Sequence, residues 1–185
     1  QAGVKCLERF LHVMYNQPER RLEVFYDRNY RSLLDMQSYG HDIEAAWLII
    51  EAATVVGDAT LIEHFGELAR HIAAAAAEGL QSDGSMAYEY DPESQHHDND
   101  RHWWVQAETV VGYFYMWHLY GDEEALERAV RTWKYIDKDI IDHTNGEWWW
   151  SRKADGTINL NEDKAGFWKC PYHNSRMCIE LLQTM

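Results

Sequence analysis

No apolar run in this sequence approaches the roughly eighteen residues that a helix needs to cross a bilayer. Charged residues interrupt the longest candidate, as Glu44 and Glu51 do on either side of Trp47. Residues 1–9 also lack the basic-then-apolar order of a secretory signal. We therefore expect a cytoplasmic protein with no membrane partner. The chain opens on an amphipathic pattern without an initiator Met, which indicates a start within a longer protein.

Cysteine and basic charge are both scarce. Cys6, Cys170 and Cys178 are odd in number and lack metal-type spacing, so we expect buried, reduced thiols. A formal net charge of −14 argues against nucleic acid as a partner, because phosphate binding needs clustered Lys and Arg. The sequence also lacks a phosphate-binding Gly loop, a Ser nucleophile elbow, a CxxC pair and an HExxH motif.

Aromatic residues, in contrast, are abundant. They make up 14% of the 185 residues, and nine of them are Trp. Large side chains fill helical cores, and aromatic faces also suit the apolar faces of sugar rings. The sequence leaves both uses open.

Apolar residues recur at helical spacing along most of the chain. The pattern predicts helices over residues 4–16, 41–56, 58–77, 103–120 and 122–141, and a sixth from Pro171 onward. The positions expected to face inward in the third and fifth helices are Leu61, Ile62, Phe65, Leu68, Ile72, Leu126, Ala129, Val130, Trp133, Ile136 and Ile140. Strand-and-turn segments between the helices predict short hairpins that share one rim with the following helix N-termini.

A helix-pair repeat organises the chain. Gly-Asp pairs at 57–58 and 121–122 each offer a helix stop followed by a cap for the next helix, and they lie 64 residues apart. The same offset carries Glu44 onto Glu108, and it carries position 108 to within one residue of His173. Repeats of this kind indicate a stacked or closed array of one supersecondary unit.

Only about three such units are present, each a helix pair with a hairpin. The helix at 103–120 is apolar on most faces and needs burial all round. A ring of six pairs would supply that burial, and three pairs make half a ring. We therefore expect an all-α fold, with residues 1–185 forming a single partial domain.

Residue pairs three or four apart place chemically active side chains on one face of each apolar helix. These pairs are His41 with Glu44, Trp104 with Glu108, and His173 with Arg176. Converging helices would bring them to one mouth. Imidazole titrates near neutrality, which suits acid/base chemistry, and a carboxylate beside each imidazole would fix its tautomer. A carboxylate among Ala and Ile, as at Glu44, is costly to bury without a purpose.

Structural interpretations of the same residues compete with this one. A histidine at a helix start is ordinarily a surface residue, and Trp104 could simply fill the core. We expect His96 and His97, in a polar run, to be solvated loop residues. A zinc site made of His41, His173 and a carboxylate is chemically conceivable, although the close ligand spacing of zinc motifs is absent.

Three segments of the chain resemble the N-acylglucosamine 2-epimerase superfamily, and most closely its cellobiose 2-epimerases. They are YGHDIEAAW at 39–47, WWVQAE at 103–108 and WKCPYHN at 168–174, in this order along the chain. The resemblance covers essentially the whole chain, but the family's proteins are longer. It implies an (α/α)6 barrel whose helix pairs are joined by short hairpins, with this chain as the C-terminal half.

The resemblance implies reversible epimerisation at C2 of a reducing-end glucose, such as cellobiose to glucosyl-mannose, without a metal or nucleotide cofactor. After ring opening, a base removes the C2 proton, an enediolate forms, and an acid returns a proton to the opposite face. The implied site residues are His41 and His173 as acid and base, Glu44 and Glu108 as orienting or ring-opening groups, and Trp47 and Trp104 as sugar-stacking groups. The family's site also uses residues from the first half, including an arginine, and these are absent from this chain.

Other functions stay compatible with these residues. An (α/α)6 glycoside hydrolase could use Glu44 and Glu108 as its two carboxylates. An aldose–ketose isomerase would share the enediol intermediate. A third alternative is an inactive carbohydrate-binding fragment that self-associates or pairs with a missing N-terminal half. In every case the expected ligand is a monosaccharide or an oligosaccharide.

Overall fold

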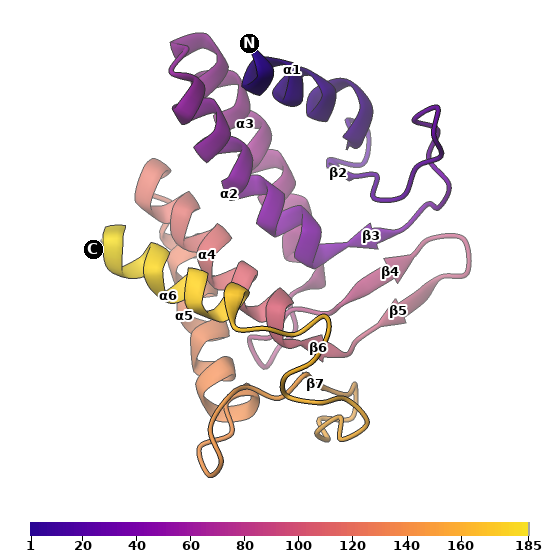
Figure 1. Ribbon diagram of the computed structural model, residues 1–185, viewed down its shortest axis with the longest axis vertical. Coiled ribbons are helices and arrows are strands. Elements are labelled where there is room, and N and C mark those ends of the chain that lie inside the picture. The colour runs from indigo at the N-terminus through magenta and orange to yellow at the C-terminus, as the bar shows by residue number, and fades with distance from the viewer. Residues whose placement is uncertain (185) are drawn as a thin grey trace.

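The computed structural model describes residues 1–184, which form helices joined by short strands and loops (Figure 1). The α-helices are α1 (Ala2–Arg9), α2 (Tyr39–Val56), α3 (Ala59–Ala76), α4 (Trp103–Tyr120), α5 (Glu123–Tyr135) and α6 (Tyr172–Thr184). One π-helical turn follows α1 (Phe10–Met14) and another follows α5 (Ile136–Ile140), while a 3-10 turn follows α3 (Ala77–Gly79). No helix in this part of the chain is long and apolar enough to cross a membrane.

The helices are arranged in an inner and an outer layer. The inner helix α4 packs against α2 on one side and against α6 on the other. The outer helices α3 and α5 pack on α2 and α4 respectively. Most side chains of α4 are buried, since helices contact it from several directions, as its apolar sequence predicts.

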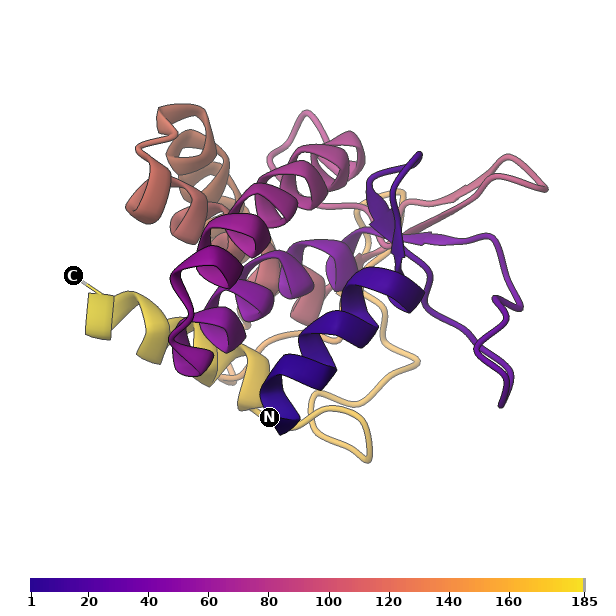
Figure 2. The same cartoon turned by 90° about the horizontal axis from the view of Figure 1, so that it is seen from above.

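The strands are two or three residues long and join the helix pairs. They are β1 (Tyr15–Asn16), β2 (Arg21–Leu22), β3 (Gln37–Ser38), β4 (Glu89–Asp91), β5 (His96–Asp98), β6 (Arg101–His102) and β7 (Ser151–Arg152). All pairings are antiparallel: β1 with β2, β4 with both β3 and β5, and β6 with β7. Figures 1 and 2 show the strands at the end of the molecule where α2, α4 and α6 begin, so this end is the expected rim.

The repeated Gly-Asp pairs end and start helices as predicted. Gly57 and Gly121 terminate α2 and α4 with φ of 77° and 69°, a left-handed conformation that glycine adopts without strain. The Asp58 carboxylate then accepts hydrogen bonds from two backbone N–H groups of α3, and Asp122 accepts one from Ala125 of α5. This local chemistry explains why the predicted ends of α2 and α4 and the predicted starts of α3 and α5 agree with the structure to within one residue.

Several predicted inward positions are wrong. Ile62 on α3 is 37% exposed, and Val130 and Trp133 on α5 are each 41% exposed. Outer helices are covered only on the flank that meets the inner layer, so a broad apolar stripe extends beyond the contact. The sequence also predicts continuous α-helices over residues 4–16 and 122–141. In the structure, a π-helical turn follows the α-helix in each of these segments.

Two further expectations need correction. All three cysteines are exposed free thiols instead of buried ones, because they lie on helix or loop faces that no other element covers. His96 and His97 are exposed as expected, but they form part of strand β5, where a hairpin with β4 orders the polar run.

Candidate functional site

A cavity of about 370 Å³ opens at the rim where α2, α4 and α6 converge. Its lining residues are His41, Glu44, Tyr88, His102, Trp103, Trp104, Trp150, Trp168, Tyr172 and His173. Four of the six residues predicted for the site therefore line one cavity. The other two do not line it: Glu108 bonds to His173, and Trp47 bonds to Glu108.

His173 is held by a carboxylate. Its Nδ1 lies 2.6 Å from Oε1 of Glu108, a residue with no solvent exposure. An Nδ1–H donated to Glu108 leaves Nε2 as the nitrogen with a free lone pair. The arrangement provides the predicted carboxylate partner for this imidazole and fixes the ring's orientation.

A second contact that positions His173 comes from Trp103. The edge of Trp103 meets its ring at a centroid distance of 5.3 Å, and the buried Lys169 ammonium lies 4.9 Å from the Trp103 ring centroid. Lys169 donates hydrogen bonds to Glu147 Oε1, at 2.8 Å, and to the backbone oxygens of Trp148 and Lys164. Lys169, which lies three residues before α6, therefore connects the start of this helix to the loops that contain Glu147, Trp148 and Lys164.

His41 has a hydroxyl partner. Its Nδ1 shares a hydrogen bond of 2.8 Å with Oγ of Ser38, the residue that precedes α2. The prediction of a carboxylate partner for this imidazole is wrong, because the Glu44 carboxylate bonds to Arg176 instead. Burial lowers the pKa of His41, and the neighbouring His173 lowers it further, so the neutral imidazole is favoured.

Arg176 connects the two glutamates. Its Nη2 donates to Oε1 of Glu44 at 2.5 Å and to Oε1 of Glu108 at 2.7 Å. Burial raises the pKa of Glu44, the negative charge of Glu108 adds to this effect, and Arg176 opposes it. Burial alone would lower the pKa of Arg176, but its bonds to Glu108 and Glu44 raise it overall. The guanidinium is therefore a permanent cation between two carboxylates.

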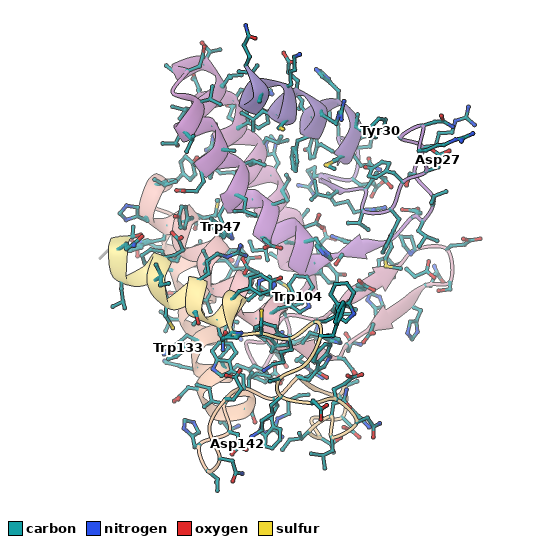
Figure 3. The ribbon with its side chains drawn as sticks, in the orientation of Figure 1. Asp27, Tyr30, Trp47, Trp104, Trp133 and Asp142 are labelled. Carbon is teal, nitrogen blue, oxygen red and sulfur yellow. The ribbon has the colours of Figure 1, made fainter. Side chains whose placement is uncertain are left out.

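The two predicted stacking residues occupy different positions (Figure 3). Trp104 packs against both imidazoles, with ring centroids 4.9 Å from His41 and 5.5 Å from His173. Trp47 is almost fully buried, and its Nε1 donates to Oε2 of Glu108 at 3.0 Å. In the described structure Trp104 borders the cavity, while Trp47 supports the carboxylate behind it.

Three side chains of the site could in principle hold a metal ion. Among residues 1–184, potential ligand atoms of Glu44, Glu108 and His173 lie within 4.8 Å of one another. The Arg176 nitrogen, however, already contacts oxygens of both carboxylates. A metal ion at this position would have to displace a guanidinium, so the residues fit a metal poorly. His41, which the zinc alternative requires, is not in this group.

Several residues of the site were not predicted from the sequence. Ser38 ends strand β3, and its contact with His41 depends on the turn into α2. The sequence places Arg176 on the same helix face as His173, but the bonds of Arg176 reach residues 132 and 68 positions away. His102 and Tyr88 line the cavity with their rings stacked at 3.9 Å. Only the polar aromatic character of these two could have suggested a role.

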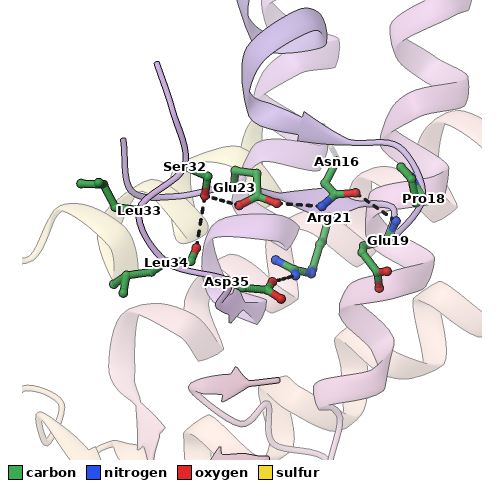
Figure 4. A pocket seen from close by; sticks show the side chains of 9 residues that line it. All are labelled: Asn16, Pro18, Glu19, Arg21, Glu23, Ser32, Leu33, Leu34 and Asp35. Atoms are coloured by element: carbon green, nitrogen blue, oxygen red, sulfur yellow. Dashed lines mark hydrogen bonds and ion pairs between the residues drawn. The ribbon is translucent and has the colours of Figure 1, made fainter. Parts of the chain in front are cut away.

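A second polar cavity, of about 520 Å³, lies beside β1 and β2 (Figure 4). Its polar groups largely satisfy one another: Glu23 accepts hydrogen bonds from Asn16 at 2.7 Å and from Ser32 at 2.6 Å, and Arg21 pairs with Asp35. None of the six predicted site residues lines it.

Known proteins with similar sequences and folds match nearly the whole chain. The sequence profile of the N-acylglucosamine 2-epimerase family matches residues 3–176. A protein named cellobiose 2-epimerase from Bacteroides fragilis is 51% identical over 173 residues, which cover 94% of this chain and 44% of that protein. The chain thus spans less than half the length of this curated relative.

Solved structures give the same result. The crystal structure of a sugar epimerase from a ruminal bacterium matches with a TM-score of 0.91 and 38% identity, covering 96% of this chain and 45% of that one. The structure of cellobiose 2-epimerase from Bacillus thermoamylovorans matches with a TM-score of 0.90 and 35% identity, covering 98% and 46%. The expected fold, half of an (α/α)6 barrel with helix pairs joined by short hairpins, is confirmed.

Proposed function

Because the chain belongs to the N-acylglucosamine 2-epimerase family, we propose that it carries the proton-transfer groups of a carbohydrate 2-epimerase. The reaction is reversible epimerisation at C2 of a reducing-end glucose, of the type that converts cellobiose to glucosyl-mannose. One observation supports this proposal above all others. Two imidazoles, each with Nδ1 bonded to an oxygen, pack against the same indole in one cavity.

The chemistry assigns one imidazole to each face of C2. Once the hemiacetal ring has opened, one neutral imidazole removes the C2 proton, and the electron pair moves onto the aldehyde oxygen to give an enediolate. The other imidazole, as imidazolium, donates a proton to the opposite face of C2, and the ring closes. His41 and His173 are the two groups, and neither reaction direction consumes a co-reactant.

The remaining residues support these two. Glu108 orients His173 and stabilises its protonated form. Glu44 reaches the cavity and assists ring opening, while Arg176 holds both carboxylates in place. We assign sugar stacking to Trp104 and give Trp47 the different role of orienting Glu108, because its indole N–H is already bonded there.

Hydrolysis by Glu44 and Glu108 has less support. Glycosidases need two carboxyl groups that both reach the scissile bond. Glu108 has no solvent exposure, and the same Arg176 nitrogen binds both carboxylates. A pair held this way is not placed to attack a glycosidic bond, and Glu108 is instead bonded to the His173 imidazole.

Residues 1–185 form one partial domain in this proposal, and the complete activity needs further chain. The curated relative is more than twice as long, so we propose that the open side of the helix layer pairs with an N-terminal half or with a second copy. The substrate class is a monosaccharide or an oligosaccharide, as the names of the relatives suggest. The proposed reaction requires no metal or nucleotide cofactor.

The proposal is tested by incubating the chain with cellobiose in D₂O and following C2 by NMR. The assay is run with the chain alone and with the chain mixed with the N-terminal half of the Bacteroides fragilis relative. Deuterium at C2 together with a mannose-type product is the expected result. A ketose product would point to aldose–ketose isomerisation and free glucose to hydrolysis. No turnover in either preparation would overturn the proposal.

The role of His173 is tested in the same assay. His173→Asn should abolish deuterium incorporation, because the Asn amide acts as neither an acid nor a base near neutral pH. His97→Asn is the matched control, since His97 is exposed on β5 and does not line the cavity. Normal exchange in the His173 variant would exclude it from proton transfer.

A further inference from the structure

The cavity contains a third imidazole that the proposed reaction does not use. The ring of His102 lies flat on the ring of Tyr88, with centroids 3.9 Å apart and an angle of 14° between the planes. Both residues line the cavity together with His41 and His173. The backbone of His102 is fixed by pairing with Ser151 across β6 and β7, one residue before α4 begins.

His102 differs from the other two imidazoles in its partners. Ser38 and Glu108 bond to Nδ1 of His41 and His173, but no hydrogen bond within residues 1–184 involves the His102 ring. Burial lowers the pKa of His102, although Asp98 and Asp100 act in the opposite direction. A neutral imidazole has one N–H donor and one acceptor nitrogen, and a half-buried ring gains free energy when both are used.

We propose that His102 is a sugar-binding residue, one of whose ring nitrogens hydrogen-bonds to a hydroxyl of the substrate in the cavity, with Tyr88 fixing the plane of the ring. This inference rests on the proposed function. A hydroxyl both donates and accepts, so it can pair with either ring nitrogen of a neutral imidazole. Proton transfer is the weaker assignment, because no carboxylate or hydroxyl among residues 1–184 fixes the tautomer of His102 as one does for His41 and His173.

The chain supplies a matched control for this pair. On the β4–β5 hairpin, His97 stacks on Tyr90 at 4.2 Å with an interplanar angle of 20°. This second pair has the same chemistry, but neither residue lines the cavity. A change that affects His102 and spares His97 therefore reports on the cavity and not on histidine–tyrosine stacking in general.

Binding is tested by NMR on protein carrying histidine labelled with ¹³C at Cε1, titrated with cellobiose. We expect the resonances of His102 and His173 to shift together with one dissociation constant, while that of His97 stays in place. The His102 and His97 signals are assigned by their loss in His102→Phe and His97→Phe. A shift of His173 without His102 would overturn this inference and leave the proposed function intact. If neither shifts, sugar does not enter the cavity, and both fail.

Kinetics separate binding from catalysis. His102→Phe keeps a flat ring on Tyr88 and removes both nitrogens, so KM should rise roughly three- to tenfold, the effect of one hydrogen bond. The turnover number and its pH profile should stay unchanged. His102→Gln, which retains a donor and an acceptor, should recover part of the affinity, and His97→Phe should behave as wild type.

Two kinetic results would overturn the assignment. A fall in turnover number at constant KM, or a displaced acid limb of the pH profile, would place His102 in proton transfer. A KM equal to that of wild type in both His102 variants would exclude contact with the sugar. Circular dichroism and thermal unfolding confirm that each variant is folded before its kinetics are compared.

Discussion

Glu108 is the residue on which the site and the fold both depend. Its carboxyl group has no solvent exposure and accepts hydrogen bonds from Trp47, His173 and Arg176. These donors come from α2 and α6, while Glu108 itself belongs to α4. Burying a carboxylate is costly unless it is paired and hydrogen-bonded, and three donors meet that condition. A single side chain therefore links all three inner helices.

The first prediction concerns the cation in this cluster. Arg176→Met leaves two carboxylates beside each other without a counter-charge, so the free energy of unfolding should fall by about 3 kcal/mol. Deuterium exchange at C2 should also decrease strongly, because His173 loses its ordered surroundings. Urea unfolding and the NMR exchange assay measure the two effects. In the control, Arg20→Met, an exposed pair with Glu78 at 4.0 Å is removed, and the cost should stay below about 0.5 kcal/mol.

The second prediction concerns Asp42, which is fully buried beside the site. Its Oδ1 accepts a hydrogen bond from the backbone N–H of Leu22 at 2.8 Å, and its Oδ2 has no partner among the described residues. Burial raises the pKa of Asp42 from 3.8 to about 7, although the Leu22 bond and Arg21 oppose the shift. The folded state therefore holds a proton that the unfolded state releases.

The proton on Asp42 makes the free energy of unfolding depend on pH. Between about pH 4 and pH 7 the folded protein binds more protons at this site, so its contribution to stability decreases as the pH rises. Asp42→Asn keeps the oxygen that accepts from Leu22 and cannot ionise, so its stability should change less over this range. Urea unfolding at pH 5 and pH 8 compares the variants. An equal slope in both proteins would show that Asp42 titrates normally.

At the scale of elements, the three inner helices are aligned in register. Glu44, Glu108 and His173 meet at one level, and seven residues further along each helix Tyr115 bonds to Glu51 and Glu180 at 3.2 and 2.8 Å. Two helical turns separate the levels. The sequence repeat predicted the first level correctly. It did not single out the second, although the same offset of 64 residues carries Glu51 onto Tyr115, because a Tyr aligned with two Glu is not a recognisable catalytic pattern.

The third prediction uses the close approach of α2 and α4. A Cβ at Gly112 would lie 2.5 Å from Cγ1 of Ile43 and 2.8 Å from the Ile43 backbone oxygen. Gly112→Ala should therefore destabilise the fold by roughly 2 kcal/mol, despite the better helix propensity of Ala. Thermal unfolding measures the change. Gly166→Ala, where nothing lies within 4 Å of the added Cβ, is the matched control and should be neutral.

Much of the fold and part of the site followed from sequence because their causes are local. Gly57 and Gly121 end helices through their own backbone freedom, and the apolar period of α4 requires burial. The contacts of Ser38 and Arg176 could not be predicted, since they depend on how a turn is closed and how α6 meets α2. The exposure of Trp133 likewise depends on which neighbours cover α5, and periodicity does not reveal them.

At the scale of the molecule, apolar side chains on both flanks of the inner layer are uncovered. Val55 on α2 is 85% exposed, and Leu182 on α6 is 76% exposed. Exposed apolar groups of this kind favour association. This agrees with a chain that spans less than half of its curated relative.

The fourth prediction follows from these flanks. The chain in solution should show a mass that increases with concentration, because two copies cover part of each other's apolar surface. Sedimentation equilibrium measures it. Val55→Glu together with Leu182→Glu should shift the equilibrium toward the monomer, whereas Lys138→Glu, at an exposed polar position, should not. A strictly monomeric wild-type chain would contradict the prediction.

The central place of α4 sets the distance between the two imidazoles. His41 is carried by α2 and His173 by α6, and each helix packs along α4. The size of the α4 side chains that contact α2 and α6 therefore sets the distance between the two imidazoles. A larger side chain on one flank of α4 would increase the distance between the His41 and His173 rings, and a smaller one would decrease it, without any change to either histidine. In the proposed reaction, substitutions on α4 alone would therefore change the distance between the acid and the base.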